Sequence, residues 1–182
     1  MPIYIALLRG INVGPHKRMK MEKLRAGCES LGLKQVATYI QSGNLVFQGP
    51  ALSPASLSGK IRKRIAADFG FEVDVITRTC EELKKIIRTN PLLKEPGVDE
   101  AKLHVMFLAE PPTAEAIQKL ESLTLAPDRV RVSEKEIYFY FPNGVSGSSL
   151  WKHNLDKVLS ASSTMRNWRT VCTLDQMATE MA

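Results

Sequence analysis

Residues 3–21 read IYIALLRGINVGPHKRMKM, in which an apolar run precedes a glycine loop and the start of a helical pattern. This order predicts a strand, a loop and a helix. Gly10 and Gly14 permit positive φ angles and let a ligand approach the main chain closely. Because the first N–H groups of a helix carry partial positive charge, an anion can dock where the loop enters the helix. The spacing matches neither the phosphate-loop nor the dinucleotide-binding pattern, so glycines that only turn the chain are an equal alternative.

Basic residues in the same segment support the anion prediction. Lys17, Arg18 and Lys20 are expected in the first helical turn, where cations oppose the helix dipole unless an anion lies nearby. The 182-residue chain carries 25 Lys and Arg against 19 Asp and Glu, a net charge of +6. This charge favours anionic partners without requiring them, and no single basic block dominates.

The composition is that of an ordinary globular protein, with 44% hydrophobic and 24% charged residues. Cys28, Cys80 and Cys172 lie far apart and form no C-x-x-C pair, so neither a disulfide framework nor a metal site is expected. The apolar run at residues 2–8 is too short for a signal peptide, and no apolar span reaches membrane length. We therefore expect a cytoplasmic protein without membrane association.

The first half of the chain predicts the order β-α-β-β-α-β. After the opening strand come a helix ended by Gly32, a hairpin around Ser42-Gly43, a helix capped by Ser53 and a strand at residues 72–76. This is the order of a ferredoxin-like split unit, with an antiparallel sheet and helices on one face. The helical periodicities here and farther along predict these buried side chains: Leu24, Leu31, Ile61, Ile65, Leu120 and Leu174.

A capping box at Thr79 and Glu82 begins a helix that Asn90-Pro91 ends, and a boundary follows near Gly97. The second half then predicts a strand at residues 103–108, a helix, a hairpin at residues 129–133 and 136–141, a helix containing Trp151 and a last helix capped by Thr170. Its order, β-α-β-β-α, lacks a final strand. The predicted fold is α+β, with two ferredoxin-like (split β-α-β) sub-units at residues 1–97 and 98–182 and mainly antiparallel sheets.

Two features of the second half admit more than one interpretation. Tyr138 and Tyr140 alternate with the core residues of their strand and either stack on nucleic-acid bases or pack beneath a helix or loop. Residues 164–169, TMRNWR, are polar and lack a core period. We expect this segment to pack across the two halves beside residues 9–14; an ordinary turn between helices is the alternative.

Four motifs span nearly the whole chain: RGINVG at residues 9–14, TYIQSGN at 38–44, Asn90-Pro91 and TMRNW at 164–168. In these motifs and their order the chain resembles a bacterial domain-of-unknown-function family, number 1697. This resemblance implies an α+β fold with two ferredoxin-like sub-units and no assigned activity. Pro15 departs from the family, which usually has a second glycine there, and a proline leaves an anion cradle with one N–H fewer.

The sequence shows no catalytic constellation, so catalytic residues and cofactor stay unknown and no metal ligands are expected. His16 is the one histidine considered as an acid or base, whereas His104 is expected to be structural. Arg and Asn suit planar recognition of phosphate, carboxylate or a base edge, although Asn12, Ser42 and Asn44 could equally cap turns. The candidate ligand-binding residues are Arg9, Gly10, Asn12, Gly14, Lys17, Ser42, Asn44, Arg166 and Asn167.

The leading functional hypothesis is a cytosolic protein that binds an anionic ligand at the glycine loop. The partner would be a nucleotide, another phosphorylated metabolite or single-stranded nucleic acid. An enzyme acting on a phosphorylated small molecule at the same loop is one alternative. An interaction or homodimerising protein without a small-molecule site is the other, and the oligomeric state is undetermined by the sequence.

Overall fold

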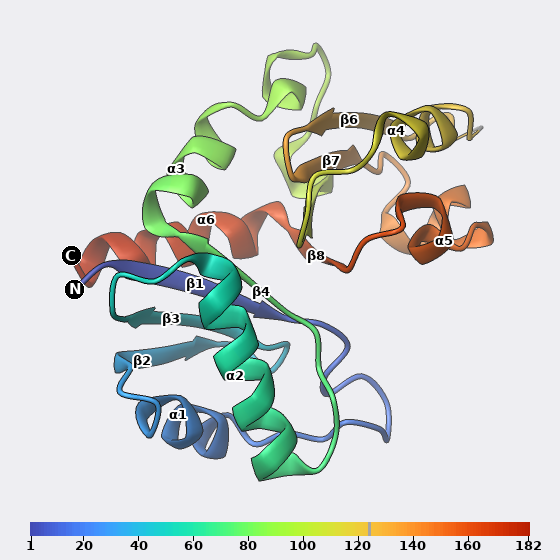
Figure 1. The fold of residues 1–182 in the computed structure, drawn as a ribbon. Coiled ribbons are helices and arrows are strands. Elements are labelled where there is room, and N and C mark those ends of the chain that lie inside the picture. Colours follow the sequence, from blue (N-terminus) through green and yellow to red (C-terminus); the bar gives the residue numbers. More distant parts are fainter. Residues whose placement is uncertain (124) are drawn as a thin grey trace. The chain divides into compact units, whose positions relative to one another are not determined.

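The computed structural model describes residues 1–123 and 125–182 and combines helices with strands (Figure 1). The chain forms two compact units, one comprising Met1–Lys85 with Cys172–Ala182 and the other Ile86–Val171. Within the described residues, each unit contains one four-stranded antiparallel sheet. The α+β class is thus confirmed, while the division at residues 97 and 98 stays a prediction.

The first unit has the chain order expected from its sequence. Its sheet runs β2-β3-β1-β4, formed by β1 (Ile3–Leu8), β2 (Lys34–Tyr39), β3 (Asn44–Gln48) and β4 (Val75–Thr79). Helices α1 (Met21–Glu29) and α2 (Pro54–Phe69) follow β1 and β3. The prediction β-α-β-β-α-β is therefore confirmed.

Alternation along β1 explains how these helices attach to the sheet. Tyr4, Ala6 and Leu8 share one face and join a buried cluster with apolar residues of both helices, among them Leu24 and Ile61. Of the side chains predicted to be buried, Leu24, Ile61, Ile65, Leu120 and Leu174 are each at most 1% exposed. Leu31 is only partly buried, because α1 ends two residues before it.

The element boundaries of the first unit follow local chemistry. Ser53 caps α2 by accepting the Ser56 N–H, and Gly70 ends it in the left-handed conformation, as predicted. Helix α1 ends earlier than predicted, with Ser30 as its C-cap and Gly32 two residues beyond. The last strand lies at Val75–Thr79 rather than at residues 72–76, because its ladder with β1 begins at the pair Leu8 and Val75.

Helix α3 (Cys80–Arg88) starts directly after β4 at the predicted capping box. The Glu82 N–H donates to Thr79 Oγ1 at 3.1 Å. The Thr79 N–H in turn donates to a Glu82 carboxylate oxygen at 2.8 Å, which completes the reciprocal pair.

The second unit corrects the sequence-based prediction, because it does have a final strand. Its sheet runs β6-β7-β5-β8, formed by β5 (Leu103–Leu108), β6 (Arg129–Ser133), β7 (Glu136–Tyr140) and β8 (Ser163–Asn167). Helix α4 (Ala114–Glu121) follows β5. Strand β8 occupies most of the segment for which either packing across the halves or a turn between helices was predicted. The turn interpretation is wrong, because this segment pairs with β5 along its length.

The helix predicted around Trp151 is also wrong in detail. The chain forms short 3-10 turns and then α5 (Leu155–Leu159), because the Asn154 side chain accepts the Lys157 N–H and starts a new helix. The 3-10 turns of the second unit are η1 (Pro91–Lys94), η2 (Glu100–Lys102), η3 (Val145–Gly147) and η4 (Ser149–Lys152).

The last helix, α6 (Trp168–Glu180), begins earlier than predicted. The Thr170 N–H donates to Asn167 Oδ1 at 2.8 Å, so Asn167 rather than Thr170 is the cap. The predicted cap is the third residue of the helix and acts as the donor in this bond.

Tyr138 and Tyr140 are buried, with exposures of 1% and 7%. Their hydroxyls donate to the backbone oxygens of Ile86, at 3.2 Å, and Gly97, at 3.3 Å. Packing beneath neighbouring chain is therefore the correct interpretation, and these rings offer no stacking surface for bases.

Candidate functional site

A twelve-residue loop, residues 9–20, connects β1 to α1 and is held closed by one side chain. Asn12 Nδ2 donates to the backbone oxygens of Met19, at 3.0 Å, and Gln41, at 2.8 Å. The Met19 N–H donates back to Asn12 Oδ1 at 2.8 Å. These bonds join the two ends of the loop to each other and to the hairpin between β2 and β3, as in compact surface loops whose ends lie close together.

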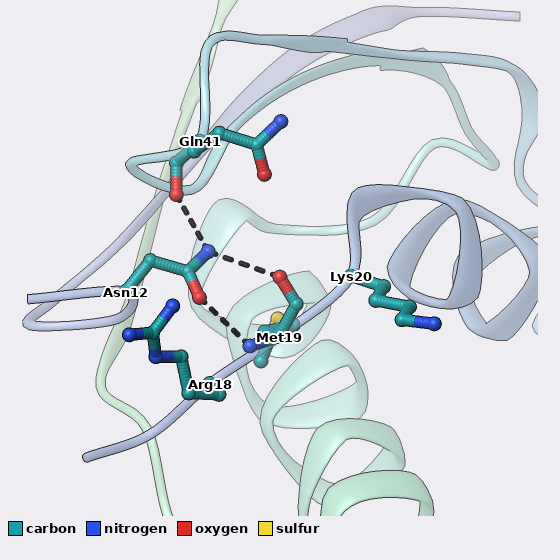
Figure 2. A pocket seen from close by; sticks show the side chains of 5 residues that line it. All are labelled: Asn12, Arg18, Met19, Lys20 and Gln41. Atoms are coloured by element: carbon teal, nitrogen blue, oxygen red, sulfur yellow. Dashed lines mark hydrogen bonds between the residues drawn. The ribbon is translucent and has the colours of Figure 1, made fainter. Parts of the chain in front are cut away.

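A hollow of about 540 Å³ opens beside the three hydrogen bonds of the Asn12 side chain. Figure 2 shows Asn12 hydrogen-bonded to Met19 and Gln41. The Arg18 and Lys20 side chains extend in different directions from the loop segment that contains Met19. Met19 is buried, whereas Arg18, Lys20 and Gln41 are exposed. The lining residues are Asn12, Arg18, Met19, Lys20 and Gln41.

The cations of this segment differ in their partners. Lys17 Nζ donates to the Glu72 backbone oxygen at 2.9 Å, so its ammonium is already engaged. Arg18 and Lys20 make no side-chain hydrogen bond or ion pair with any residue that the structure describes. Two exposed positive charges without internal partners therefore border the hollow.

These cations precede the helix instead of occupying its first turn, which corrects the sequence-based expectation. Helix α1 begins at Met21, and Lys20 is its N-cap residue, with no side-chain capping bond. The leading N–H groups of α1 therefore follow directly after the two unpaired cations, so the dipole and the side chains favour the same sign of ligand charge.

The hairpin loop that supplies Gln41 has an unusual backbone. Ile40 has φ +49° although it is β-branched, and its side chain is 53% exposed. Gly43 has φ +79°, and a Cβ built there would lie 2.6 Å from Leu8 Cβ. A glycine is thus required at position 43 both by conformation and by close packing.

Ser42 and Asn44 organise that same loop. Asn44 is fully buried, and its Nδ2 donates to the Tyr39 backbone oxygen at 3.0 Å and to Ser42 Oγ at 2.9 Å. The side-chain bonds are those of a turn cap. A direct role in ligand binding stays a prediction for both residues.

Arg9, Gly10 and Gly14 lie in the loop without lining the hollow. Arg9 follows β1, and its N–H donates to the Asp74 backbone oxygen at 3.0 Å. Gly10 and Gly14 are exposed and both have φ +65°, and a Cβ added at either position would meet no atom within 4 Å. Backbone conformation therefore accounts for a glycine at both positions, and a role in ligand binding stays a prediction.

Arg166 and Asn167 belong to the second unit, where β8 and α6 hold them. Arg166 is 9% exposed and donates to Thr164 Oγ1 at 2.7 Å and to the Met165 backbone oxygen at 2.9 Å. Burial lowers the pKa of its guanidinium to about 10, which leaves it charged at neutral pH. A joint site with residues of the first unit stays a prediction.

Burial limits the reactivity of two side chains, Cys28 and His104. Burial, reinforced by Asp68, raises the pKa of the Cys28 thiol to about 12, so it stays protonated and unreactive. His104 packs edge-on against Phe141 with ring centroids 5.2 Å apart, and burial lowers its pKa. His16 is exposed in the loop. Within residues 1–123 and 125–182, no group of three or more His, Cys, Asp and Glu side chains is placed to hold a metal ion.

The sequence indicated the loop that borders the hollow, and ligand binding there stays a prediction. Arg18 and Lys20 were expected only as supporting charges, and the predicted ligand-binding set did not include Gln41. In the sequence, Lys17, Arg18 and Lys20 look equally suited to bind an anion. Only the fold reveals which of them already has a partner.

Comparison with solved structures supports the fold. The conserved bacterial protein SP0830 from Streptococcus pneumoniae matches with a TM-score of 0.79 and 24% identity, over 97% of this chain and 98% of that one. No curated protein matches significantly. None of the described helices is both long and apolar enough to cross a bilayer.

The family comparison covers most of the chain. A family model described as "Protein of unknown function (DUF1697)" matches residues 1–138, which include the loop, the hairpin and the whole hollow. Since this is well over half of the sequence, the chain belongs to the DUF1697 family.

Proposed function

We propose that the protein binds an anionic ligand, a nucleotide or another phosphorylated metabolite, in the hollow between the loop at residues 9–20 and the hairpin loop. The observation that supports this proposal is the pair of unpartnered cations, Arg18 and Lys20, at its border. Other cations nearby, such as Lys17 and Lys23, already donate to backbone oxygens.

The chemistry of the two cations suits a phosphate group. A guanidinium presents a planar fork of donors, and an ammonium adds a compact charge with three donors. Charge-assisted bonds of this kind are roughly twice as strong as neutral ones. The start of α1 adds N–H groups and the positive end of its dipole.

Asn12 has a supporting role in this proposal, because both of its amide hydrogens and its oxygen are used within the chain. It fixes the backbone of Met19 and Gln41 on either side of the hollow. The ligand would therefore meet a preorganised surface, which lowers the entropic cost of binding.

Binding is favoured here over the two alternatives, an enzyme and a homodimerising protein. No observation in the described part of the chain favours catalysis or self-assembly over binding. The cytoplasmic location and a nucleic-acid partner likewise stay predictions.

Thermal unfolding with added ligand tests the proposal. Millimolar inorganic phosphate or AMP should raise the melting temperature of the wild type, because a ligand that binds only the folded state stabilises it. The double variant Arg18→Ala/Lys20→Ala should lose this rise. Lys60→Ala/Lys63→Ala is the matched control, since it removes two exposed cations of α2 and leaves the hollow intact.

Salt provides a second readout from the same samples. Because exposed charges are screened within about 8 Å at physiological ionic strength, the rise in melting temperature should shrink as sodium chloride is added. An equal rise in all three proteins would show that binding occurs elsewhere. No rise in any of them would refute the proposal.

A further inference from the structure

The hollow is larger than a phosphate group requires. Its volume of about 540 Å³ falls among the roughly 300 to 1,000 Å³ of pockets that enclose small organic ligands. Arg18 and Lys20 account for an anionic part of such a ligand. The remaining surface is large enough to contact an organic part as well.

That remaining surface includes the carboxamide of Gln41. The Gln41 backbone is fixed through its bond from Asn12 Nδ2. The Gln41 carboxamide itself makes no hydrogen bond to any other described residue and lies at the border of the hollow (Figure 2). Met19 also borders the hollow, but its side chain, 4% exposed, packs in the buried core of the first unit.

The Gln41 carboxamide favours a partner with a hydrogen-bonding edge. A carboxamide offers a donor and an acceptor side by side, the pattern that pairs with the N6 and N7 edge of adenine. A phosphate ester of a simple sugar would satisfy the cations but leave this carboxamide without a partner.

We infer that the ligand of this site is a free nucleoside monophosphate, with its phosphate beside the cations at the border of the hollow and its base edge on Gln41. This inference rests on the proposed function and adds the class of ligand. A nucleic-acid strand fits less well, because sheets that bind strands stack successive bases on exposed aromatics. In this chain Tyr138 and Tyr140 are buried, and Tyr4 and Phe47 of the first sheet are at most 2% exposed. Tyr39 of β2 is partly exposed, but a single ring does not provide a platform for successive bases.

Calorimetric titration of the full chain tests the inference with four ligands: inorganic phosphate, ribose 5-phosphate, AMP and a single-stranded RNA of about ten nucleotides. AMP should bind about tenfold more tightly than ribose 5-phosphate, the factor expected for one good carboxamide pair. Gln41→Ala should remove this difference and leave ribose 5-phosphate binding unchanged. Gln118→Ala, an exposed glutamine on α4, is the control and should behave as the wild type.

The other outcomes separate the inference from the proposed function. If AMP and ribose 5-phosphate bind equally and both depend on Arg18 and Lys20, the site binds phosphate esters and the nucleotide inference is overturned. If the RNA binds more tightly than AMP, a strand rather than a free nucleotide is the ligand, which also overturns it. If none of the four binds, both the inference and the proposed function fail.

Discussion

Asn12 has a conformation and a bonding pattern that few other residues can provide. Its φ of +53° lies in the left-handed region, which asparagine tolerates better than most residues. Its amide simultaneously donates two hydrogen bonds and accepts one. A substitution here affects the loop and the hairpin together.

We predict that Asn12→Ala lowers the free energy of unfolding by about 1 to 3 kcal/mol, because the backbone groups of Met19 lose their partners. Asn12→Asp should be at least as destabilising, since a carboxylate cannot donate and would face two carbonyl oxygens. Urea denaturation measures both. If Asn12→Asp is as stable as the wild type, the hydrogen bonds of this side chain do not hold the loop.

His104 gives stability a dependence on pH. Burial lowers its pKa below the usual value of 6.5, so between the two values the unfolded chain binds more protons than the folded one. Its contribution to stability is present above the unfolded pKa and is lost as the pH falls toward the folded pKa. Wild-type stability should therefore decrease as the pH is lowered from about 7.5 to about 5.5.

His104→Phe should weaken this decrease, because a phenyl ring keeps the edge-on contact with Phe141 and cannot titrate. His16→Gln, which changes an exposed loop residue, serves as the control and should retain the wild-type slope. Denaturation midpoints measured across this pH range give the slope of stability against pH for each protein. Identical slopes for His104→Phe and the wild type would show that other groups dominate.

For individual residues, the sequence could identify the polar side chains of the loops but not their hydrogen-bond partners. Asn12, Ser42 and Asn44 were ambiguous between ligand binding and turn capping, and their observed bonds to the chain depend on contacts across up to 29 positions. The same holds for Lys17, whose partner Glu72 lies 55 positions away. Composition alone cannot distinguish such a lysine from the unpaired Arg18.

At the scale of elements, variants of Asn167 at the start of α6 can distinguish a helix-capping role from a ligand-binding role. Asn167 was predicted to bind ligand, and it caps this helix by accepting the Thr170 N–H. Asn167→Ala should therefore cost about 0.5 to 2 kcal/mol of stability. Asn167→Asp should cost little, because aspartate is an equally good cap that lies at the positive end of the helix dipole.

The comparison of these two variants by urea denaturation isolates the cap. Equal losses would mean that the amide N–H₂ group matters and that capping is not the main contribution. A ligand whose binding is abolished by Asn167→Asp, with stability preserved, would instead support the predicted binding role.

Elements with a clean apolar period were predictable. The apolar stripes of residues in α1 and α2 correctly predicted helices, and the alternation of apolar and polar residues in β6 and β7 correctly predicted a hairpin. Strand β8 was not foreseen, because Thr164 and Arg166 are buried polar residues and break the alternation expected of a strand. Strand β4 was displaced, because buried Val73 extends the apolar pattern into a segment outside the ladder.

At the scale of the whole molecule, the two units repeat one plan. Arg78 on β4 pairs with Ile5 of β1, and Arg166 on β8 pairs with Val105 of β5, in matching registers. In each unit a helix follows directly, capped by Thr79 or Asn167. The sequence suggested this repetition from element order, but the missing strand left it incomplete.

The C-terminal segment, Cys172–Ala182, completes the first unit despite its distance in sequence. Gln48 Nε2 of β3 donates to the Met181 backbone oxygen at 3.3 Å, across 133 positions. Periodicity could predict the helix but not which sheet it joins, because such contacts depend on the folded chain.

We predict that Leu174→Ala, which removes a side chain only 1% exposed, lowers stability by about 2 to 5 kcal/mol. Hydrogen exchange should show reduced protection in β1 and β3, because the segment belongs to their unit. Gln176→Ala, an exposed position on the same helix, should change stability by no more than about 0.5 kcal/mol. Loss of protection confined to Ile86–Val171 would contradict the assignment.

The position of a bound anion in a crystal tests the central claim most directly. Selenate has the shape and charge of a tetrahedral oxyanion, and its selenium gives an anomalous signal. In crystals soaked with selenate, the anomalous map should show a peak in the hollow about 4 Å from the donor nitrogens of Arg18 or Lys20, the separation expected for charge-assisted bonds to its oxygens. The peak should be absent in Arg18→Ala/Lys20→Ala crystals. Selenate ordered at other sites, with no peak in the hollow of the wild type, would contradict the account.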